Sequence, residues 1–483
     1  MQEVNAETTT APEYRCAGLP RANPTQSFWI HSSPNANPLR CEGNDGPLTA
    51  DADICIIGSG ITGVGVAYHL SELVATLATT ILDSPLRAVI LEAREFCGGA
   101  TGRNGGHLTP ISFFNFAGQE EQYGIEEAIR SSALETYTAS SIVNVIERHG
   151  WSKEIDLVNG GHVSLFFTQD EIKRLERDFE RAKSAGLDLD DVQWLTAEEV
   201  NKTFGTPYPA VTRPGWNLWP AKLVTKLYER AIQRVGERFD LKLHTYTPVT
   251  SVERLAQTVS GSERALLLST HRGSISCSRV VHATNGYASY LLPNLADPDG
   301  IMPWRGQIIA TRASVGPELI GSNSWSKIDE IEGLDYYWFP RPLEPGQNNP
   351  LVILGRGSEP CTDDDSSLNP AGAKRLRELL PGWFEGKYEQ GNEPEMEWSG
   401  ITAYTAMRDP FVGPVIDLST GDDSAYRGQY ISAGYSGHGM PRAFGCAEVV
   451  AQMIIAELSG NEWSCPMWLP ERYLTWNRVR HQN

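Results

Sequence analysis

The sequence lacks an excess of basic residues and any long hydrophobic segment. Its 483 residues include 41 Lys and Arg against 60 Asp and Glu, which gives a formal net charge of −19. This acidity argues against nucleic acid or an anionic membrane as a partner, because contacts with phosphates require clustered Lys and Arg. The longest apolar runs, such as Ile54–Ile57 and Val449–Ala456, are much shorter than the about 20 residues of a membrane-spanning helix. We therefore expect a folded, soluble protein with no nucleic acid and no membrane among its partners.

Cysteine is scarce and shows no paired spacing. The eight cysteines lie at positions 16, 41, 55, 97, 277, 361, 446 and 465, and none forms a C-x-x-C pair. This pattern does not suit a disulfide scaffold, and the histidines lack the spacing of metal ligands, so no metal is expected. Residues 1–10 contain no basic or apolar run, and the last three residues are not a peroxisomal signal. The expected location is cytoplasmic.

The hydrophobic patterning predicts an α/β fold, α+β overall. Helix and strand signals alternate near both ends of the chain, and a strand-rich block lies between them, which indicates a Rossmann-like parallel domain with an inserted, mostly antiparallel domain. Residues 120–149 have helical spacing, and residues 155–168 predict a β-hairpin around Gly160 and Gly161. The expected order is an arm (1–48), the Rossmann-like domain (49–150, 206–295 and 396–465), the inserted domain (151–205 and 296–395) and a tail (466–483).

A dinucleotide-binding motif follows the first buried strand. Gly58–Gly63 fits G-x-G-x-x-G, opens a predicted helix and leads to a second strand that ends at Glu92. Gly58 permits the tight turn, Gly60 lets the backbone approach a pyrophosphate, and Gly63 lets the helix pack close to the sheet. The free N–H groups of the helix bind phosphates, and Glu92 accepts hydrogen bonds from a ribose. This motif leaves both FAD and NAD possible.

A second glycine-rich loop favours a flavin. Residues 98–107 contain five glycines, at 98, 99, 102, 105 and 106, soon after Glu92. A loop lined by backbone can reach a large planar ring as well as the pyrophosphate. A flexible surface loop is the simpler alternative, but it would not normally lie so close to the residue that binds the ribose.

These motifs together resemble the D-amino-acid-oxidase-type FAD oxidoreductases, and within them the glycine/sarcosine oxidase-like and γ-glutamylputrescine oxidase-like enzymes. The resemblance rests on Gly58–Gly63, Glu92 and Gly99–Gly106, and it extends over about residues 50–460. Three distal segments agree in order and spacing: Val280–Gly286, Trp398–Gly413 and Gly434–Met440.

The resemblance implies an FAD-binding domain in the Rossmann-like part and a substrate domain in the inserted part. It implies these cofactor-binding residues: Gly58, Gly60, Ile61, Thr62, Gly63, Glu92, Ala93, Ala100, Thr101, Arg103, Asn104, Gly105, Gly106, His107, Val249, Ala283, Thr284, Gly286, Gly434, Gly437, His438, Gly439 and Met440. Noncovalent FAD is expected, because Ile401–Thr405 contains no cysteine and Arg103 occupies the position where some relatives carry a linking histidine. His107 is the remaining candidate for a covalent link.

The reaction that the resemblance implies is oxidation of a C–N bond in a small amine or amino acid. Hydride passes to flavin N5, and dioxygen then reoxidises the flavin to give hydrogen peroxide. The expected catalytic residues are His107 near N5, with Tyr337 and Arg341 holding the amine and a carboxylate. Packing at the domain interface is the alternative role for the neighbouring aromatic residues. Met407 and Ile353 depart from the family pattern, so the residues support flavin reduction more strongly than dioxygen as the electron acceptor.

Two other functions remain open from the sequence. The same fold and flavin serve 2-hydroxy acid oxidation in some members of the superfamily. A flavin-binding protein without turnover is the other possibility, and the unusual Met407 and Ile353 keep it in view. The sequence identifies neither the amine, its stereochemistry, the oligomeric state nor the role of residues 1–48.

Overall fold

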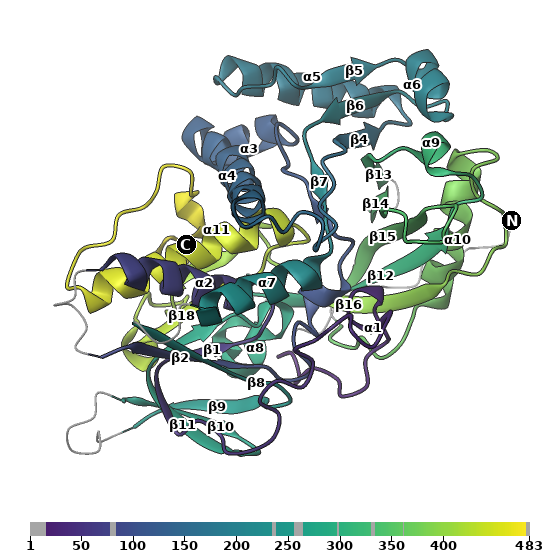
Figure 1. The fold of residues 1–483 in the computed structure, drawn as a ribbon. Coiled ribbons are helices and arrows are strands. Elements are labelled where there is room, and N and C mark those ends of the chain that lie inside the picture. Colours follow the sequence, from purple (N-terminus) through teal and green to yellow (C-terminus); the bar gives the residue numbers. More distant parts are fainter. Residues whose placement is uncertain are drawn as a thin grey trace, which may run out of the picture.

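The computed structural model describes residues 16–77, 84–233, 238–255, 264–296, 299–329, 334–360 and 362–479. The chain forms two large sheets, which lie side by side in Figure 1, and helices cover them. The helices are α1 (Phe28–His31), α2 (Ile61–Thr76), α3 (Phe116–Tyr123), α4 (Ile125–His149), α5 (Gln169–Ser184), α6 (Ala197–Phe204), α7 (Pro220–Gln233), α8 (Ala288–Leu291), α9 (Pro317–Ile320), α10 (Pro370–Trp383) and α11 (Met440–Leu458).

The first sheet is the predicted Rossmann-like sheet. Its main strand order is β17 (Phe411–Pro414), β18 (Gln429–Ala433), β11 (Gly273–His282), β1 (Asp51–Ile57), β2 (Leu86–Leu91) and β8 (Phe239–His244). The five strands from β18 to β8 run parallel, whereas β17 pairs antiparallel with β18. Strands β9 (Val249–Arg254) and β10 (Leu266–Thr270) extend β11 as an antiparallel ribbon.

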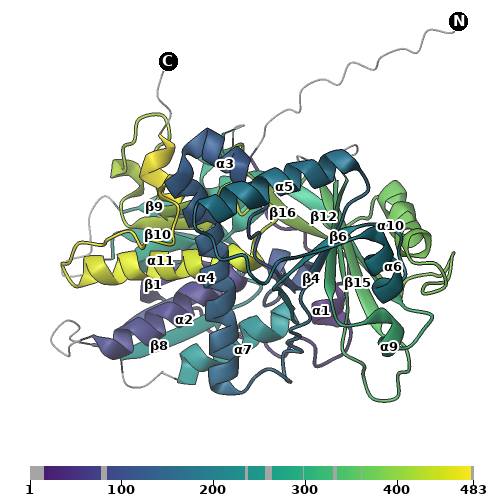
Figure 2. The ribbon, with the colours of Figure 1, turned by 90° about the horizontal axis from the view of Figure 1, so that it is seen from above.

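Both faces of this sheet are covered, which explains why Ile54–Ile57 of β1 are all apolar and buried. Helices α2, α7 and α11 pack on one face, and Figure 2 shows them running alongside one another. On the other face the side chains of Cys55 and Val89 join those of Leu266 and Leu268 in a separate buried cluster. The parallel strands therefore end together at one edge, where open α/β sheets bind their ligands.

The second sheet is the predicted inserted sheet. Its order is β16 (Met396–Tyr404), β12 (Met302–Arg312), β15 (Leu351–Pro360), β14 (Leu334–Pro340), β13 (Ser324–Asp329), β4 (His162–Leu165), β6 (Ala210–Arg213) and β5 (Gln193–Leu195). All neighbours pair antiparallel except β13 and β4. The apolar face of α10 packs on it, with Leu376 and Leu380 in the same cluster as Trp338.

Three details differ from the expectations. Strands β6 and β16, which follow the predicted boundaries at 206 and 396, pair within the second sheet rather than the first. The predicted hairpin at 155–168 is wrong: residues 152–156 form turns, and β4 pairs with β6 and β13 instead. The helix predicted over 120–149 is divided, because Gly124 adopts φ 86° between α3 and α4.

The arm packs against the glycine-rich loop at the junction of the two sheets. Ser27 Oγ donates a hydrogen bond to the Gly102 carbonyl, and the Trp29 indole donates one to the Asn104 carbonyl. The Trp29 side chain is fully buried and contacts the rings of Trp219 and Phe339. Residues 16–48 are thus part of the packed structure, a role that the sequence did not reveal.

Trp29→Ala is expected to lower the free energy of unfolding by about 3–5 kcal/mol, because a large buried ring is lost and the loop loses a hydrogen bond. Trp476→Ala, at a site where the indole is 43% exposed, is the matched control and should cost less than about 1 kcal/mol. Denaturant unfolding measures both values. Equal losses in the two variants would contradict the structural role of the arm.

Candidate functional site

A cavity of about 1060 Å³ lies where the carboxyl ends of β1, β2 and β11 face β14, β15 and β16. Most of the predicted cofactor-binding residues line it. They are Gly58, Gly60, Ile61, Thr62, Glu92, Ala93, Ala100, Thr101, Arg103, Asn104, Gly105, Gly106, His107, Val249, Ala283, Thr284, Gly437, His438, Gly439 and Met440. Strands β1 and β11 lie far apart in the chain, and folding brings their carboxyl ends to the same space.

The first glycine motif has the geometry that its sequence predicts. Gly58 adopts φ 108°, and a Cβ there would lie 2.7 Å from the Ala283 carbonyl oxygen. A Cβ on Gly63 would lie 1.9 Å from the Gly58 carbonyl oxygen, so α2 can approach the strand this closely only without a side chain. Gly63 itself does not line the cavity, and its contribution is to the packing of the helix.

Glu92 lies directly after β2 with its carboxylate buried at the cavity wall. One carboxylate oxygen accepts hydrogen bonds from the Ser59 amide at 2.9 Å and the Ser59 hydroxyl at 2.7 Å, and the other accepts one from the Arg94 amide at 3.0 Å. These bonds fix the orientation of an acceptor group beside the phosphate-binding turn, as binding of a ribose requires.

The second glycine loop contains the 3₁₀ helix Ala100–Arg103. The Arg103 guanidinium is buried and donates to the carbonyls of Gly98, Thr25 and Ser399. Burial, together with the neighbouring Arg94, lowers the pKa of Arg103 to about 10, so it remains charged at neutral pH. Arg103 was predicted to bind the cofactor, and the bonds it makes within the protein position the loop.

Tyr337 of β14 packs between two glycines. A Cβ on Gly105 would lie 2.1 Å from the Tyr337 ring, and one on Gly355 would lie 2.4 Å from it. The ring lines the cavity, and burial raises the pKa of its hydroxyl above the usual range. The glycine loop and the second sheet therefore meet at a predicted catalytic residue.

His107 lies beside Tyr337, with ring centroids 5.3 Å apart and the planes nearly perpendicular. Burial lowers the pKa of His107 to about 4, so the imidazole is neutral at physiological pH. Its Nε2 is buried and has no hydrogen-bond partner among the residues that the structure describes. A polar ligand in the cavity can supply that partner.

The distal turns form the remaining wall. Asn285 has φ 45° and accepts a hydrogen bond from the Gly434 amide at 3.0 Å, which joins two of the predicted segments. A Cβ on Gly286 would lie 2.5 Å from the Thr402 carbonyl oxygen. Gly286 and Gly434 do not line the cavity, so these predicted residues shape the turns around it.

Arg341, the predicted carboxylate clamp, does not reach the cavity. Its buried guanidinium lies 2.9 Å from Asp156 and 3.1 Å from Glu344, and it stacks on the rings of Phe28 and Trp219. The structure therefore corrects this assignment: Arg341 is occupied by the arm and by the turn at residues 152–156.

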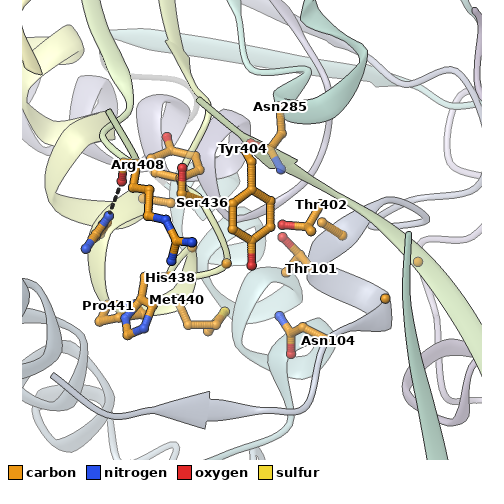
Figure 3. Close-up of a pocket in the computed structure, with 18 of the residues that line it drawn as sticks. Thr101, Asn104, Asn285, Thr402, Tyr404, Arg408, Ser436, His438, Met440 and Pro441 are labelled. Carbon is orange, nitrogen blue, oxygen red and sulfur yellow. Dashed lines mark hydrogen bonds between the residues drawn. The ribbon is translucent and has the colours of Figure 1, made fainter. Parts of the chain in front are cut away.

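The cavity residues that the sequence did not assign include Tyr404, Arg408 and Asp335. Figure 3 shows Tyr404, Arg408 and His438 directed into the same part of the cavity. Burial raises the pKa of Tyr404 to about 12. The sequence offered one indication of Arg408. It directly follows Met407, where the turn departs from the family pattern, and such a departure can accompany a change at the site.

A buried ion pair between Glu135 and Arg442 holds the N-terminal end of α11 in place. Glu135 accepts a hydrogen bond from Arg442 Nε at 2.7 Å, and His438 Nδ1 lies 3.5 Å from the other carboxylate oxygen. Burial acts to raise the pKa of Glu135, but Arg442 and His438 outweigh it and hold this pKa at about 2. The final glycine loop is thereby fixed to α4.

The cavity suits FAD. It contains a helix N-terminus for the pyrophosphate, a fixed carboxylate for the ribose and two glycine loops that a planar ring can approach. Two further buried polar atoms at its wall, Thr284 Oγ1 and the Tyr287 hydroxyl, have no hydrogen-bond partner within the described ranges. The fold and the site together define a dinucleotide-dependent oxidoreductase with a separate substrate sheet.

The chain belongs to the FAD dependent oxidoreductase (DAO) family, whose model matches residues 53–453. It is 24% identical over 418 residues to γ-glutamylputrescine oxidoreductase of Escherichia coli, covering 85% of this chain and 84% of the relative. It is 23% identical over 422 residues to glycine oxidase of Bacillus licheniformis, covering 85% and 95%. The structure of glycine oxidase from Geobacillus kaustophilus matches 90% of this chain and 100% of its own, with a TM-score of 0.65 and 20% identity. FAD is therefore the cofactor.

Two features are absent from the described part of the chain. No helix there is both long enough and apolar enough to cross a bilayer. No group of His, Cys, Asp and Glu side chains within the same residues could hold a metal ion.

Gly105→Ala is expected to displace the Tyr337 ring, which would lower the free energy of unfolding by about 1–3 kcal/mol and reduce the FAD content of the purified protein. Gly382→Ala is the control, because a Cβ at this position in α10 meets nothing within 4 Å. The ratio of flavin absorbance to protein absorbance measures FAD content. Full FAD content in Gly105→Ala would show that this contact does not shape the site.

Proposed function

We propose that this protein oxidises the C–N bond of a small amine or amino acid, with noncovalently bound FAD as the electron acceptor. The observation that carries the proposal is the juxtaposition of the flavin-type glycine loop with Tyr337, Tyr404 and Arg408 in one cavity. The printed names of two relatives, a γ-glutamylputrescine oxidoreductase and a glycine oxidase, support an amine or amino acid as substrate.

When bound, the flavin supplies a two-electron acceptor for the hydride of the carbon next to the nitrogen. The protein's own residues then have to bind and orient the substrate. Arg408 is the proposed carboxylate-binding residue in place of Arg341. Its backbone carbonyl accepts a hydrogen bond from Arg442 at 3.1 Å, and no described carboxylate forms a salt bridge with its guanidinium.

The two tyrosines and His107 are proposed to orient the amine. Because burial raises the pKa values of Tyr337 and Tyr404, both hydroxyls stay protonated at neutral pH and can donate hydrogen bonds. The neutral His107 adds no positive charge that would repel a cationic substrate. These contacts hold the nitrogen and leave the carbon facing the glycine loop.

Dioxygen is the proposed final electron acceptor, with hydrogen peroxide as product. A cytoplasmic location is proposed as well, and the seven cysteines of the described ranges, all free, are compatible with a reducing compartment.

Anaerobic bleaching of the flavin band tests the proposed reaction. Glycine, N-methylglycine, both enantiomers of alanine and proline, simple alkylamines and 2-hydroxy acids are mixed separately with the enzyme. Bleaching by amines or amino acids is expected, and readmitted air should restore the band and yield hydrogen peroxide. Bleaching by 2-hydroxy acids alone would contradict C–N oxidation.

Arg408→Met is expected to weaken the apparent affinity for carboxylated amines by about 10- to 100-fold, the value of a hydrogen-bonded ion pair. Alkylamines without a carboxylate should be affected less than about twofold. Arg305→Met, outside the cavity lining, is the control. Stopped-flow flavin reduction across substrate concentrations provides the measurement, and an equal loss for both substrate classes would refute the clamp.

A further inference from the structure

Asp335 places a carboxylate on the substrate-facing side of β14. Residues 335–337 of this strand all line the cavity; Tyr336 and Trp338 also belong to the core cluster under α10, whereas Tyr337 packs against Gly105. Asp335 also lines the cavity, and although the residue keeps access to solvent there, protein atoms surround most of its carboxyl group. It lies two residues before Tyr337, which is about 7 Å along a strand.

The other acidic side chains of the cavity wall already have partners. Glu171 forms a salt bridge with Lys327 at 2.6 Å, and Asp409 forms one with Arg472 at 2.7 Å. Asp178 accepts hydrogen bonds from two backbone amides. By contrast, the Asp335 carboxylate makes no hydrogen bond and no salt bridge with any described residue.

The surroundings of Asp335 make an unpaired negative charge unfavourable. Burial raises the pKa of the Asp335 carboxyl above its usual range, and the more distant charges of His438, Arg408 and Lys327 only partly oppose this effect. A cationic ligand in contact with the carboxylate would stabilise its charged form. Arg408 and Asp335 thus bring opposite charges to one cavity.

We propose that Asp335 binds a second, non-reacting cationic group of the substrate, so that the preferred substrates are amines or amino acids with a distal ammonium group. This inference rests on the proposed function insofar as the cavity is the substrate site. The reacting nitrogen has to lie beside the glycine loop, and Asp335 is one full strand repeat farther from it than Tyr337. The net charge of −19 would also favour the approach of cations.

Isosteric pairs that differ only in the distal charge test this inference. Lysine is compared with 2-aminoheptanoate, and ornithine with norleucine, each as both enantiomers, together with 1,4-diaminobutane against pentylamine. Anaerobic titration of the holoenzyme gives binding from the shift of the flavin band and oxidation from its bleaching. At least one compound with a distal ammonium group should bind about 10-fold or more tightly than its isostere, as expected for a charge-assisted hydrogen bond.

Asp335→Asn should reduce this preference to less than about twofold, with an unchanged flavin spectrum and thermal midpoint. Glu171→Gln, which alters a cavity carboxylate already paired with Lys327, should retain the preference. Asp335→Lys should instead favour 2-aminoadipate over norleucine.

The inference is overturned if the holoenzyme shows no preference for compounds with a distal ammonium group. It is also overturned if Asp335→Asn shows the same preference as the unaltered protein. If Asp335 bound the reacting nitrogen instead, both members of a pair would weaken equally and the ratio would not change. Asp335-dependent binding without bleaching supports the inference and counts against the proposed oxidation. Bleaching by norleucine and ornithine alike, with no dependence on Asp335, supports oxidation and contradicts the inference.

Discussion

The buried Arg103 guanidinium is the interaction on which the rest of the site depends. It donates hydrogen bonds to the glycine loop at Gly98, to the arm at Thr25 and to the second sheet at Ser399, and Asp365 lies 3.8 Å away. Three parts of the chain that are remote in sequence are therefore held by one planar cation. Removal of one partner from a buried charged network costs about 3–5 kcal/mol, so this junction has few tolerated substitutions.

This junction determines where the substrate can lie. The glycine loop approaches β14 so closely that the Tyr337 ring fits only because Gly105 and Gly355 lack side chains. The substrate sheet therefore presents the first part of β14 toward the cavity, with Tyr337 near the loop and Asp335 farther out. The close approach of the glycine loop on one side and the spacing of residues along β14 on the other therefore define the shape of the cavity.

Local sequence patterns predicted the parts of the fold that depend on local physics. Gly58 and Gly63 have the close contacts expected of the motif, and the strand before Glu92 lies in the parallel sheet. The assignment of Arg341 failed because its partners, Asp156 and Phe28, are distant in sequence. For the same reason the pairing of β4 with β6 and β13 was not predicted, since a strand's partner is not encoded in its own alternation. Asp335 and Arg408 could be recognised only when the unpaired charges of the cavity were known.

The most direct test of the account is the affinity of the apoprotein for FAD in Arg103→Lys, compared with the unaltered protein and with Arg312→Lys as a control away from the cavity. Lysine keeps the charge but cannot donate to three carbonyls in the planar geometry of a guanidinium. Titration of apoprotein with FAD, followed by flavin fluorescence, should show binding weakened about 10-fold or more in Arg103→Lys alone. Equal affinity in all three proteins would contradict the claim that this buried cation forms the cofactor site.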